Sequence, residues 1–311
     1  MFLIKIKCFL EVVMKNKNGY IFRGAATALV TPFRDGEVDF DALGHLIERQ
    51  ITSGIDALVI CGTTGESATL SDREHREVLS FAIEAACGRI PMIAGTGSND
   101  TAHAIETSRF ASSLGYDALL VVTPYYNKAT ERGLVKSFSA IADAANSPII
   151  LYNVPTRTCC NISLSVYREL AKHPNIVGVK EASGNISAVA ELFAECGDCF
   201  DIYSGNDDQT LPMLSLGGAG VISVVSNIIP SKMAALCRAW FGGDIAECRR
   251  LHEKYLWLMK AMFCEVNPIP VKTALSLMGL CKGELRLPMC EASEKNTELI
   301  KGMLNELGIA R

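Results

Sequence analysis

The chain alternates between short, continuously apolar runs and longer stretches with helical periodicity. The apolar runs are five to seven residues long and recur roughly every 20 to 34 residues, which is typical of repeated strand–helix units. Parallel strands that are covered on both faces have this continuously apolar character. Eight such runs are present: GAATALV (24–30), ALVICG (57–62), PMIAGT (91–96), ALLVVTP (118–124), PIILYNV (148–154), IVGVKEA (176–182), DIYSG (201–205) and GVISVV (220–225).

Eight strand–helix units over about 225 residues predict an α/β fold, a (β/α)8 TIM barrel. An open, doubly wound parallel sheet is the alternative, but such sheets usually have fewer strands. After Pro230 the strand signal ends, and four segments with helical periodicity follow. The first should complete the barrel and the others should form a helical appendage. We therefore predict an N-terminal extension (1–19), a barrel (20–242) and a C-terminal helical appendage (243–311).

The first thirteen residues, MFLIKIKCFLEVV, only weakly resemble a signal peptide. Lys5 and Lys7 interrupt the apolar run, and no small-residue cleavage site follows. The run is also too short and too charged to span a membrane. We expect an extension that is disordered or wrongly assigned to the protein, with Met14 as an alternative start.

Composition excludes several classes of function. A net charge of −4 leaves no basic face for nucleic acid or for an anionic membrane. The twelve cysteines are too scattered, and the chain is too long, for a secreted disulfide scaffold. One C-x-x-C (Cys196 and Cys199) does not make a structural zinc site, which usually needs two well-spaced pairs. Reduced thiols in the cytoplasm fit this pattern best.

Function in such barrels lies at the carboxyl ends of the strands. The predicted strand ends carry one lysine, several tyrosines and threonines, and many glycines, a composition typical of a site. These ends are Thr31-Pro32, Cys61 to Ser67, Gly95-Thr96-Gly97, Thr123 to Asn127, Tyr152 to Pro155, Lys180-Glu181, Ser204-Gly205-Asn206 and Ile222-Ser223.

Lys180 ends a buried strand, where lysine is rare. Removal from water favours the neutral amine, a nucleophile that condenses with a ketone or an aldehyde to form a Schiff base. Taken alone, such a lysine more often extends to solvent or pairs with its neighbour Glu181. Tyr152, one strand earlier, is placed to act as the acid/base that this chemistry needs, and Thr63 and Thr64 can pass a proton or bind a carboxylate.

Metal and phosphate chemistry are less well supported. All five histidines lie on helix-like segments or loops behind the strands, whereas a metal-dependent aldolase needs clustered ligands at the strand ends. We therefore predict no metal. The run GGAG (217–220) precedes the eighth strand and so lies on the opposite face of the barrel, and a glycine-rich run alone is weak evidence for a phosphate site.

Six motifs, in order and at compatible spacing, resemble those of the dihydrodipicolinate synthase family. They are GTTGES, VTPYYN, YNVPTRT, GVKEASGN, GVISV and NPIPVK, and the likeness extends from about Tyr20 to the end of the chain. The resemblance implies a carbon–carbon lyase that joins pyruvate to aspartate 4-semialdehyde in lysine and diaminopimelate biosynthesis. It also implies that no cofactor is needed, and that the chain forms a homotetramer built from tight dimers.

The resemblance further implies a role for each matching residue. Lys180 would form the Schiff base with pyruvate, Tyr152 would be the general acid/base, and Thr63 would relay protons between Tyr152 and Tyr126. Tyr126 would enter the site of the neighbouring subunit. The implied substrate-binding residues are Thr64 for the pyruvate carboxylate, Arg157 for the carboxylate of the semialdehyde, and Gly205 and Ile222 around Lys180.

Arg157 also separates this activity from its alternatives. Aldolases and lyases that act on sugar acids share the lysine and the tyrosine but handle neutral polyol chains, whereas a forked guanidinium suits a carboxylate. A third possibility is a barrel that binds a keto acid without turning it over. The joint presence of Lys180, Tyr152, Thr63 and Tyr126 argues against it. One departure from the family pattern lies nearby, because the residue after Arg157-Thr158 is usually glycine and here is Cys159.

A second departure concerns inhibition by lysine. Members of the family that lysine inhibits hold it at the dimer interface, and the matching residues of this candidate effector site are Ser67, Ala68, Asn99 and Tyr125. His75 is a further candidate contact, although a solvated position on a helix is the favoured alternative for it. A glutamate that faces the ammonium of lysine in those members is His103 here, and a histidine of some members is Asp72. Because a histidine does not replace the charge of a carboxylate, we expect weak inhibition by lysine or none.

Overall fold

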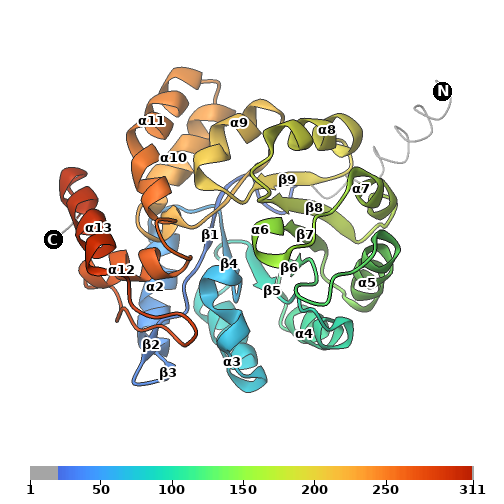
Figure 1. Cartoon of the computed structure of the whole chain (residues 1–311), viewed down its shortest axis with the longest axis horizontal. Coiled ribbons are helices and arrows are strands. Elements are labelled where there is room, and N and C mark those ends of the chain that lie inside the picture. The colour runs from blue at the N-terminus through green and yellow to red at the C-terminus, as the bar shows by residue number, and fades with distance from the viewer. Residues whose placement is uncertain (1–19, 310–311) are drawn as a thin grey trace.

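A computed structural model describes residues 20–309 as a closed barrel of eight parallel strands ringed by helices (Figure 1). The strands pair in the order β1-β10-β9-β8-β7-β6-β5-β4, with β4 returning to β1. This confirms the predicted (β/α)8 barrel and rules out the open sheet. The predicted N-terminal extension lies outside the described residues.

Each barrel strand lies within one of the eight apolar runs. The strands are β1 (Gly24–Ala28), β4 (Ala57–Ile60), β5 (Met92–Gly95), β6 (Ala118–Val122), β7 (Ile149–Asn153), β8 (Ile176–Glu181), β9 (Asp201–Ser204) and β10 (Gly220–Ser223). A short antiparallel hairpin, β2 (Phe33–Arg34) and β3 (Glu37–Val38), follows β1 and had no signal in the apolar pattern.

The helices follow the strands and turn their apolar faces to the sheet. They are α2 (Phe40–Thr52), α3 (Asp72–Ala86), α4 (Thr101–Ser113), α5 (Glu131–Ala144), α6 (Pro155–Thr158), α7 (Leu164–Leu170), α8 (Ile186–Cys196), α9 (Thr210–Ser215) and α10 (Pro230–Phe241). A side-chain cap begins each of these helices except α6, α9 and α10, and in α3 Ser71 and Glu74 form a capping box.

The apolar side chains form two separate layers. One fills the space between the strands and the helices, and the other fills the inside of the barrel. At the amino-terminal end of the strands, the rings of Phe22 and Tyr203 stack with centroids 4.2 Å apart, and the Tyr203 hydroxyl donates to the Phe22 carbonyl at 2.8 Å. This end of the barrel interior is closed, so the opposite, carboxyl-terminal end is left for a site.

The C-terminal helices are α11 (Ile245–Ala261), α12 (Ile269–Leu277) and α13 (Glu294–Glu306), which Figure 1 shows together on one side of the barrel. Helix α11 packs against α10, and α13 contacts both α11 and α12. The segment between α12 and α13 reaches back to the β2–β3 hairpin, where the Glu284 carboxylate accepts hydrogen bonds from the amides of Asp35 and Gly36. The division into barrel and appendage at residue 242 stays a prediction.

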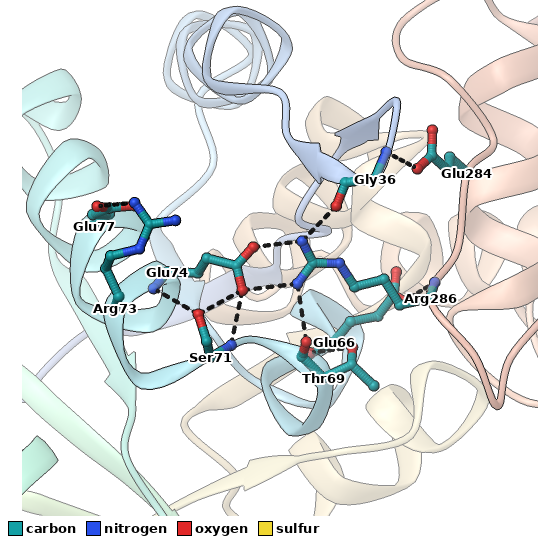
Figure 2. Close-up of polar contacts among 9 residues, drawn as sticks. All are labelled: Gly36, Glu66, Thr69, Ser71, Arg73, Glu74, Glu77, Glu284 and Arg286. Atoms are coloured by element: carbon teal, nitrogen blue, oxygen red, sulfur yellow. Dashed lines mark hydrogen bonds and ion pairs between the residues drawn. The ribbon is translucent and has the colours of Figure 1, made fainter.

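Arg286 joins the appendage to the start of α3. Its guanidinium donates to the Glu74 carboxylate, to the Thr69 carbonyl at 2.9 Å and to the Gly36 carbonyl at 2.7 Å (Figure 2). The same Glu74 carboxylate accepts from the Ser71 amide at 2.8 Å in the capping box. Arg286 therefore holds the segment that links β4 to α3.

Stability should depend on Glu74 in a pH-dependent way. The hydrogen bonds from Arg286 lower the pKa of Glu74 from 4.5 to about 2. The corresponding stabilisation is at most about 3 kcal/mol; it is complete above pH 4.5 and is lost as the pH falls toward 2. We expect Glu74→Gln to lower the free energy of unfolding by about 2 kcal/mol at pH 7. Denaturant unfolding at pH 7 and at pH 3 checks this.

The matched control for Glu74→Gln is Glu298→Gln. Glu298 pairs with Lys301 on an exposed turn of α13, so its loss should change stability by less than about 1 kcal/mol at any pH. The difference between the unchanged protein and Glu74→Gln should shrink at pH 3. A difference that is equally large at both pH values would contradict the assignment of this stabilisation to the charge of Glu74.

Candidate active site

Lys180 and Tyr152 lie side by side inside the carboxyl-terminal end of the barrel. They are register partners on β8 and β7, and the Lys180 Nζ lies 4.4 Å from the centroid of the Tyr152 ring. Lys180 is only 4% exposed and Tyr152 is also buried. The predicted nucleophile and the predicted acid/base are therefore brought together by strand register alone, across neighbouring parallel strands.

These two side chains line a cavity of about 490 Å³ at the ends of the strands. Three other predicted site residues, Thr63, Thr64 and Arg157, lie in its wall, and Gly205 lies beside Lys180. The remaining lining residues are Val154, Thr156, Ala182, Asn206, Val224, Phe263, Glu265, Val266 and Asn267. A cavity of this size suits a small organic substrate.

Gly205 is required by the space that Lys180 occupies. A Cβ atom at position 205 would stand 2.6 Å from the Ala182 Cβ and 3.2 Å from the Lys180 Cε. Any side chain at this position would therefore collide with Ala182 and crowd the lysine. Ile222, the other residue predicted around Lys180, is buried in the apolar layer inside the barrel, but it is not part of the cavity wall.

A buried carboxylate supports this wall from behind. Asp207 follows β9, and its Oδ2 accepts from the amides of Val224 and Val225 at 3.1 and 2.9 Å. Burial raises the pKa of the Asp207 carboxyl, and hydrogen bonds from the Ser223 side chain and from the amides of Val225 and Val224, with a smaller effect of the charge of Lys180, lower it in part. Asp207 therefore fixes the chain just after β10 and places a carboxyl group near the lysine.

The two threonines lie on a tight turn after β4. Thr63, Thr64 and Gly65 form a short 3-10 helix, η2 (Thr63–Gly65), and the Gly65 carbonyl accepts from the Thr31 hydroxyl at 2.7 Å. The Asn267 side-chain amide donates to the Thr64 hydroxyl oxygen at 3.0 Å. The Thr64 hydroxyl is thus held at the cavity by a residue far away in the sequence.

Arg157 lies on the short helix α6, and one terminal nitrogen of its guanidinium is anchored by a hydrogen bond. Its Nη2 donates to the Asn267 carbonyl at 2.9 Å, and the side chain lines the cavity wall. The guanidinium carries five N–H donors, and this bond to Asn267 uses one of them. Cys159 directly follows helix α6, and its φ of +52° is in the left-handed region where glycine is favoured.

Asn267 is the residue that the analysis of the sequence missed. It is buried, it holds both Thr64 and Arg157, and its Oδ1 has no hydrogen-bond partner within residues 20–309. Its signal in the sequence is the motif NPIPVK, one of the six motifs that carry the resemblance. Because Asn267 lies 203 residues after Thr64, spacing along the chain could not place it at the site.

Tyr126 does not reach the cavity of its own chain. Its side chain is 92% exposed, and its φ of +72° is unusual for a residue other than glycine. Tyr125 beside it is also exposed. Within one chain, the predicted relay from Tyr152 through Thr63 therefore lacks its third member.

A second cavity, of about 460 Å³, adjoins the first and shares four lining residues with it, Thr63, Val154, Arg157 and Asn267. Five of the six predicted effector-site residues line this second cavity: Ser67, Ala68, His75, His103 and Tyr125. Asn99, the sixth, lies next to it, because its side-chain amide donates to the Tyr125 carbonyl at 3.2 Å. Within the chain, the structure thus gathers these residues in one place.

The comparison with known proteins places the chain in a family. The sequence profile described as the Dihydrodipicolinate synthetase family matches residues 21–307. The chain belongs to this family. The match covers all the described strands and helices, including the C-terminal ones.

Relatives and solved structures agree with this assignment. The 4-hydroxy-tetrahydrodipicolinate synthase of Thermoanaerobacter pseudethanolicus is 53% identical over 292 residues, which is 94% of this chain and 98% of the relative. A dihydrodipicolinate synthase structure from Aquifex aeolicus matches with a TM-score of 0.91 at 45% identity, over 93% of this chain and 99% of that one. Another, from Cyanidioschyzon merolae with lysine bound, matches with a TM-score of 0.90 at 39% identity, over 94% and 100%.

Two features are absent from residues 20–309. No group of three or more His, Cys, Asp or Glu side chains is arranged there to hold a metal ion. None of the helices in that part of the chain is long and apolar enough to cross a membrane.

Proposed function

We propose that this member of the family is a 4-hydroxy-tetrahydrodipicolinate synthase, which condenses pyruvate with L-aspartate 4-semialdehyde. The observation that carries the proposal is a buried lysine beside a buried tyrosine, in a cavity whose wall also holds an arginine. The names of the relatives, about half identical over almost the whole chain, point to the same reaction.

The proposed chemistry begins at Lys180. Its amine attacks the keto carbon of pyruvate, water leaves, and an imine links the substrate to the lysine. Loss of a proton from the methyl carbon gives an enamine, and this carbon forms the new bond to the aldehyde carbon of the second substrate, whose oxygen takes up a proton. The amino group of the second substrate then attacks the imine carbon and displaces the amine of Lys180, which closes the ring of the product and frees the enzyme. Tyr152, next to the amine, is the group placed to move protons to and from the departing water and the aldehyde oxygen.

The two carboxylates of the substrates would be bound at two separate points on the cavity wall. We assign the carboxylate of pyruvate to Thr64 and its turn, and the carboxylate of the semialdehyde to the free N–H groups of Arg157. Asn267 holds both residues and so sets the separation of the two binding points.

The oligomer is also a proposal. We propose a homotetramer of two tight dimers, in which Tyr126 enters the cavity of the neighbouring chain and there completes the relay with Thr63 and Tyr152. The exposure and the constrained backbone of Tyr126 support this. We also propose a cytoplasmic enzyme, since buried cysteines such as Cys61, Cys237 and Cys248 pack as reduced thiols in the apolar layer between strands and helices.

One experiment separates the reaction from its alternatives. Activity is measured with pyruvate and aspartate 4-semialdehyde, coupled to the next reductase, beside pyruvate with N-acetylmannosamine. Turnover of the semialdehyde alone supports the synthase. Turnover of the sugar alone would make the protein a sugar-acid aldolase, and an imine trapped by borohydride without turnover of either would make it a binding protein.

Lysine should inhibit this enzyme weakly or not at all. Two carboxylates line the second cavity, but Glu66 is paired with Lys272, and Asp72 is 78% exposed and faces His103 at 3.8 Å. An exposed carboxylate attracts an ammonium only weakly, and the missing charge-assisted bond should cost roughly ten- to a hundred-fold in affinity. Titration of lysine into the assay checks this.

The variant His103→Glu is the matched test for this lysine prediction. It restores a carboxylate at the position where inhibited members have one, and should bring stronger inhibition while activity without lysine is unchanged. Half-inhibition of the unchanged protein at sub-millimolar lysine would contradict the prediction.

A further inference from the structure

A fully buried ion pair joins the appendage to the catalytic turn. Glu66 is the residue that follows the turn Thr63–Gly65, and Lys272 lies in the middle of α12. The two side chains form an ion pair, and neither is exposed to solvent. This pair has no part in the chemistry proposed above.

Lys272 is held on several sides. Its Nζ donates to the Glu284 carbonyl at 2.8 Å and lies 4.1 Å from the centroid of the Phe33 ring. Burial lowers the pKa of Lys272, and the charge of Glu66 raises it in part. Glu66 in turn accepts from the Arg286 amide at 3.2 Å, a contact that Figure 2 also shows. Few alternative positions are therefore open to either group.

Glu66 has an unfavourable backbone conformation, so the contacts of its side chain matter for the position of the turn. Its φ of +52° is in the left-handed region, which is unfavourable for a residue other than glycine. Glu66 ends the 3-10 helix that carries Thr63 and Thr64, and precedes a second one, η3 (Ser67–Thr69). A residue held in an unfavourable conformation at this point needs support from its surroundings, and Lys272 supplies it.

The appendage holds the same loop at two more points. Asn267, just before α12, donates to the Thr64 hydroxyl, and Arg286 donates to the Thr69 carbonyl. All three contacts come from the segment 267–286, which also contributes Asn267 to the cavity wall. The appendage therefore determines where the turn lies relative to Lys180.

Stability alone does not explain such a pair. Taking two charges out of water costs about as much as their attraction returns, so apolar residues of the same size often serve equally well. A pair kept in this place is better explained by geometry, because an ion pair fixes the position of both partners.

We propose that Glu66 and Lys272 are positioning residues: they fix the turn so that the hydroxyls of Thr63 and Thr64 face the substrate at Lys180. The expected effect of the pair on catalysis rests on the proposed function, whereas its expected effect on the position of the turn does not. Neither residue touches substrate, so both act through the threonines.

The test is the double variant Glu66→Gln/Lys272→Met, which removes both charges and nearly keeps both side-chain volumes. Amide hydrogen exchange of the segment 61–70 should become at least about tenfold faster, while that of β7 and β8 stays unchanged. The value of kcat/KM for pyruvate should fall about a hundredfold, since displacing a catalytic group by about an ångström has that effect. Most of this loss should lie in kcat.

The control is Leu304→Ala, which removes a buried apolar contact of α13 without touching the turn. It should destabilise the appendage, yet leave hydrogen exchange of the segment 61–70 unchanged and keep kcat/KM within about threefold of the unchanged protein.

If the double variant does not fold, the single variant Glu66→Asp takes its place, because it keeps the carboxylate but shortens the side chain that contacts Lys272. It should lower kcat/KM about tenfold with little change in melting temperature.

One result would overturn the proposal. It is that the double variant, or Glu66→Asp, folds and has the same hydrogen exchange in the segment 61–70 and the same activity as the unchanged protein. The proposal would also be overturned if Leu304→Ala lost as much activity as the double variant, because any destabilisation of the appendage would then have the same effect. If the unchanged protein does not convert the semialdehyde, the proposed function fails, while hydrogen exchange still decides whether the pair positions the turn.

Discussion

Replacing Lys180 with arginine should lower kcat by at least about a thousandfold, because the nucleophile of the proposed reaction is lost. Arginine keeps a positive charge and a similar length, but its guanidinium is always protonated and does not form an imine. Incubation with pyruvate and borohydride should add mass to the peptide that carries Lys180 in the unchanged protein, and none to that of Lys180→Arg. Steady-state assays and peptide mass measurement check both results.

The control for Lys180→Arg is Lys172→Arg on the exposed surface, which should keep full activity and full labelling at Lys180. The position of the added mass matters as much as its presence. If Lys180→Arg still gains mass at another lysine, or retains more than about one per cent of the activity, Lys180 is not the group that binds pyruvate covalently.

The barrel could be predicted because its signal is local. Each strand is a short apolar run, and the order of strands in a (β/α)8 barrel follows from the order of the runs in the sequence. The pairing of Lys180 with Tyr152 follows from the same logic, since neighbouring strands place their ends side by side. For these residues, sequence order and spatial order agree.

The contacts made by the appendage could not be predicted in the same way. Asn267 and Lys272 reach the turn after β4 across about two hundred residues, and no periodicity relates the two segments. One clue was available for Lys272: a lysine within the apolar run of α12 must find a buried partner. The clue does not say which carboxylate that partner is.

Tyr126 shows another limit. Its place in the motif implies a role at the site, but its own chain leaves it exposed and outside the cavity. A residue that acts in a neighbouring subunit has no partner to be found in its own sequence or fold. Its role therefore depends on an assembly, and stays a proposal.

Replacing Arg157 with methionine should separate the two substrates. We expect kcat/KM for aspartate 4-semialdehyde to fall by about a hundred- to a thousandfold, because a charge-assisted, forked contact to a carboxylate is lost. The rate at which pyruvate forms its imine should change by less than about threefold, since Arg157 is assigned to the other substrate. Steady-state kinetics and the rate of borohydride trapping measure the two effects separately.

The variant Arg157→Lys is the matched control, because it keeps the charge and removes the fork. It should lie between the unchanged protein and Arg157→Met, with a loss of about ten- to a hundredfold for the semialdehyde. Arg157 also donates to the Asn267 carbonyl, and Asn267 holds Thr64, so a purely structural role is the competing explanation. In that case imine formation with pyruvate would slow as much as the reaction with the semialdehyde. Equal losses in the two measurements would therefore assign Arg157 to the support of the turn, and unequal losses would assign it to the carboxylate of the second substrate.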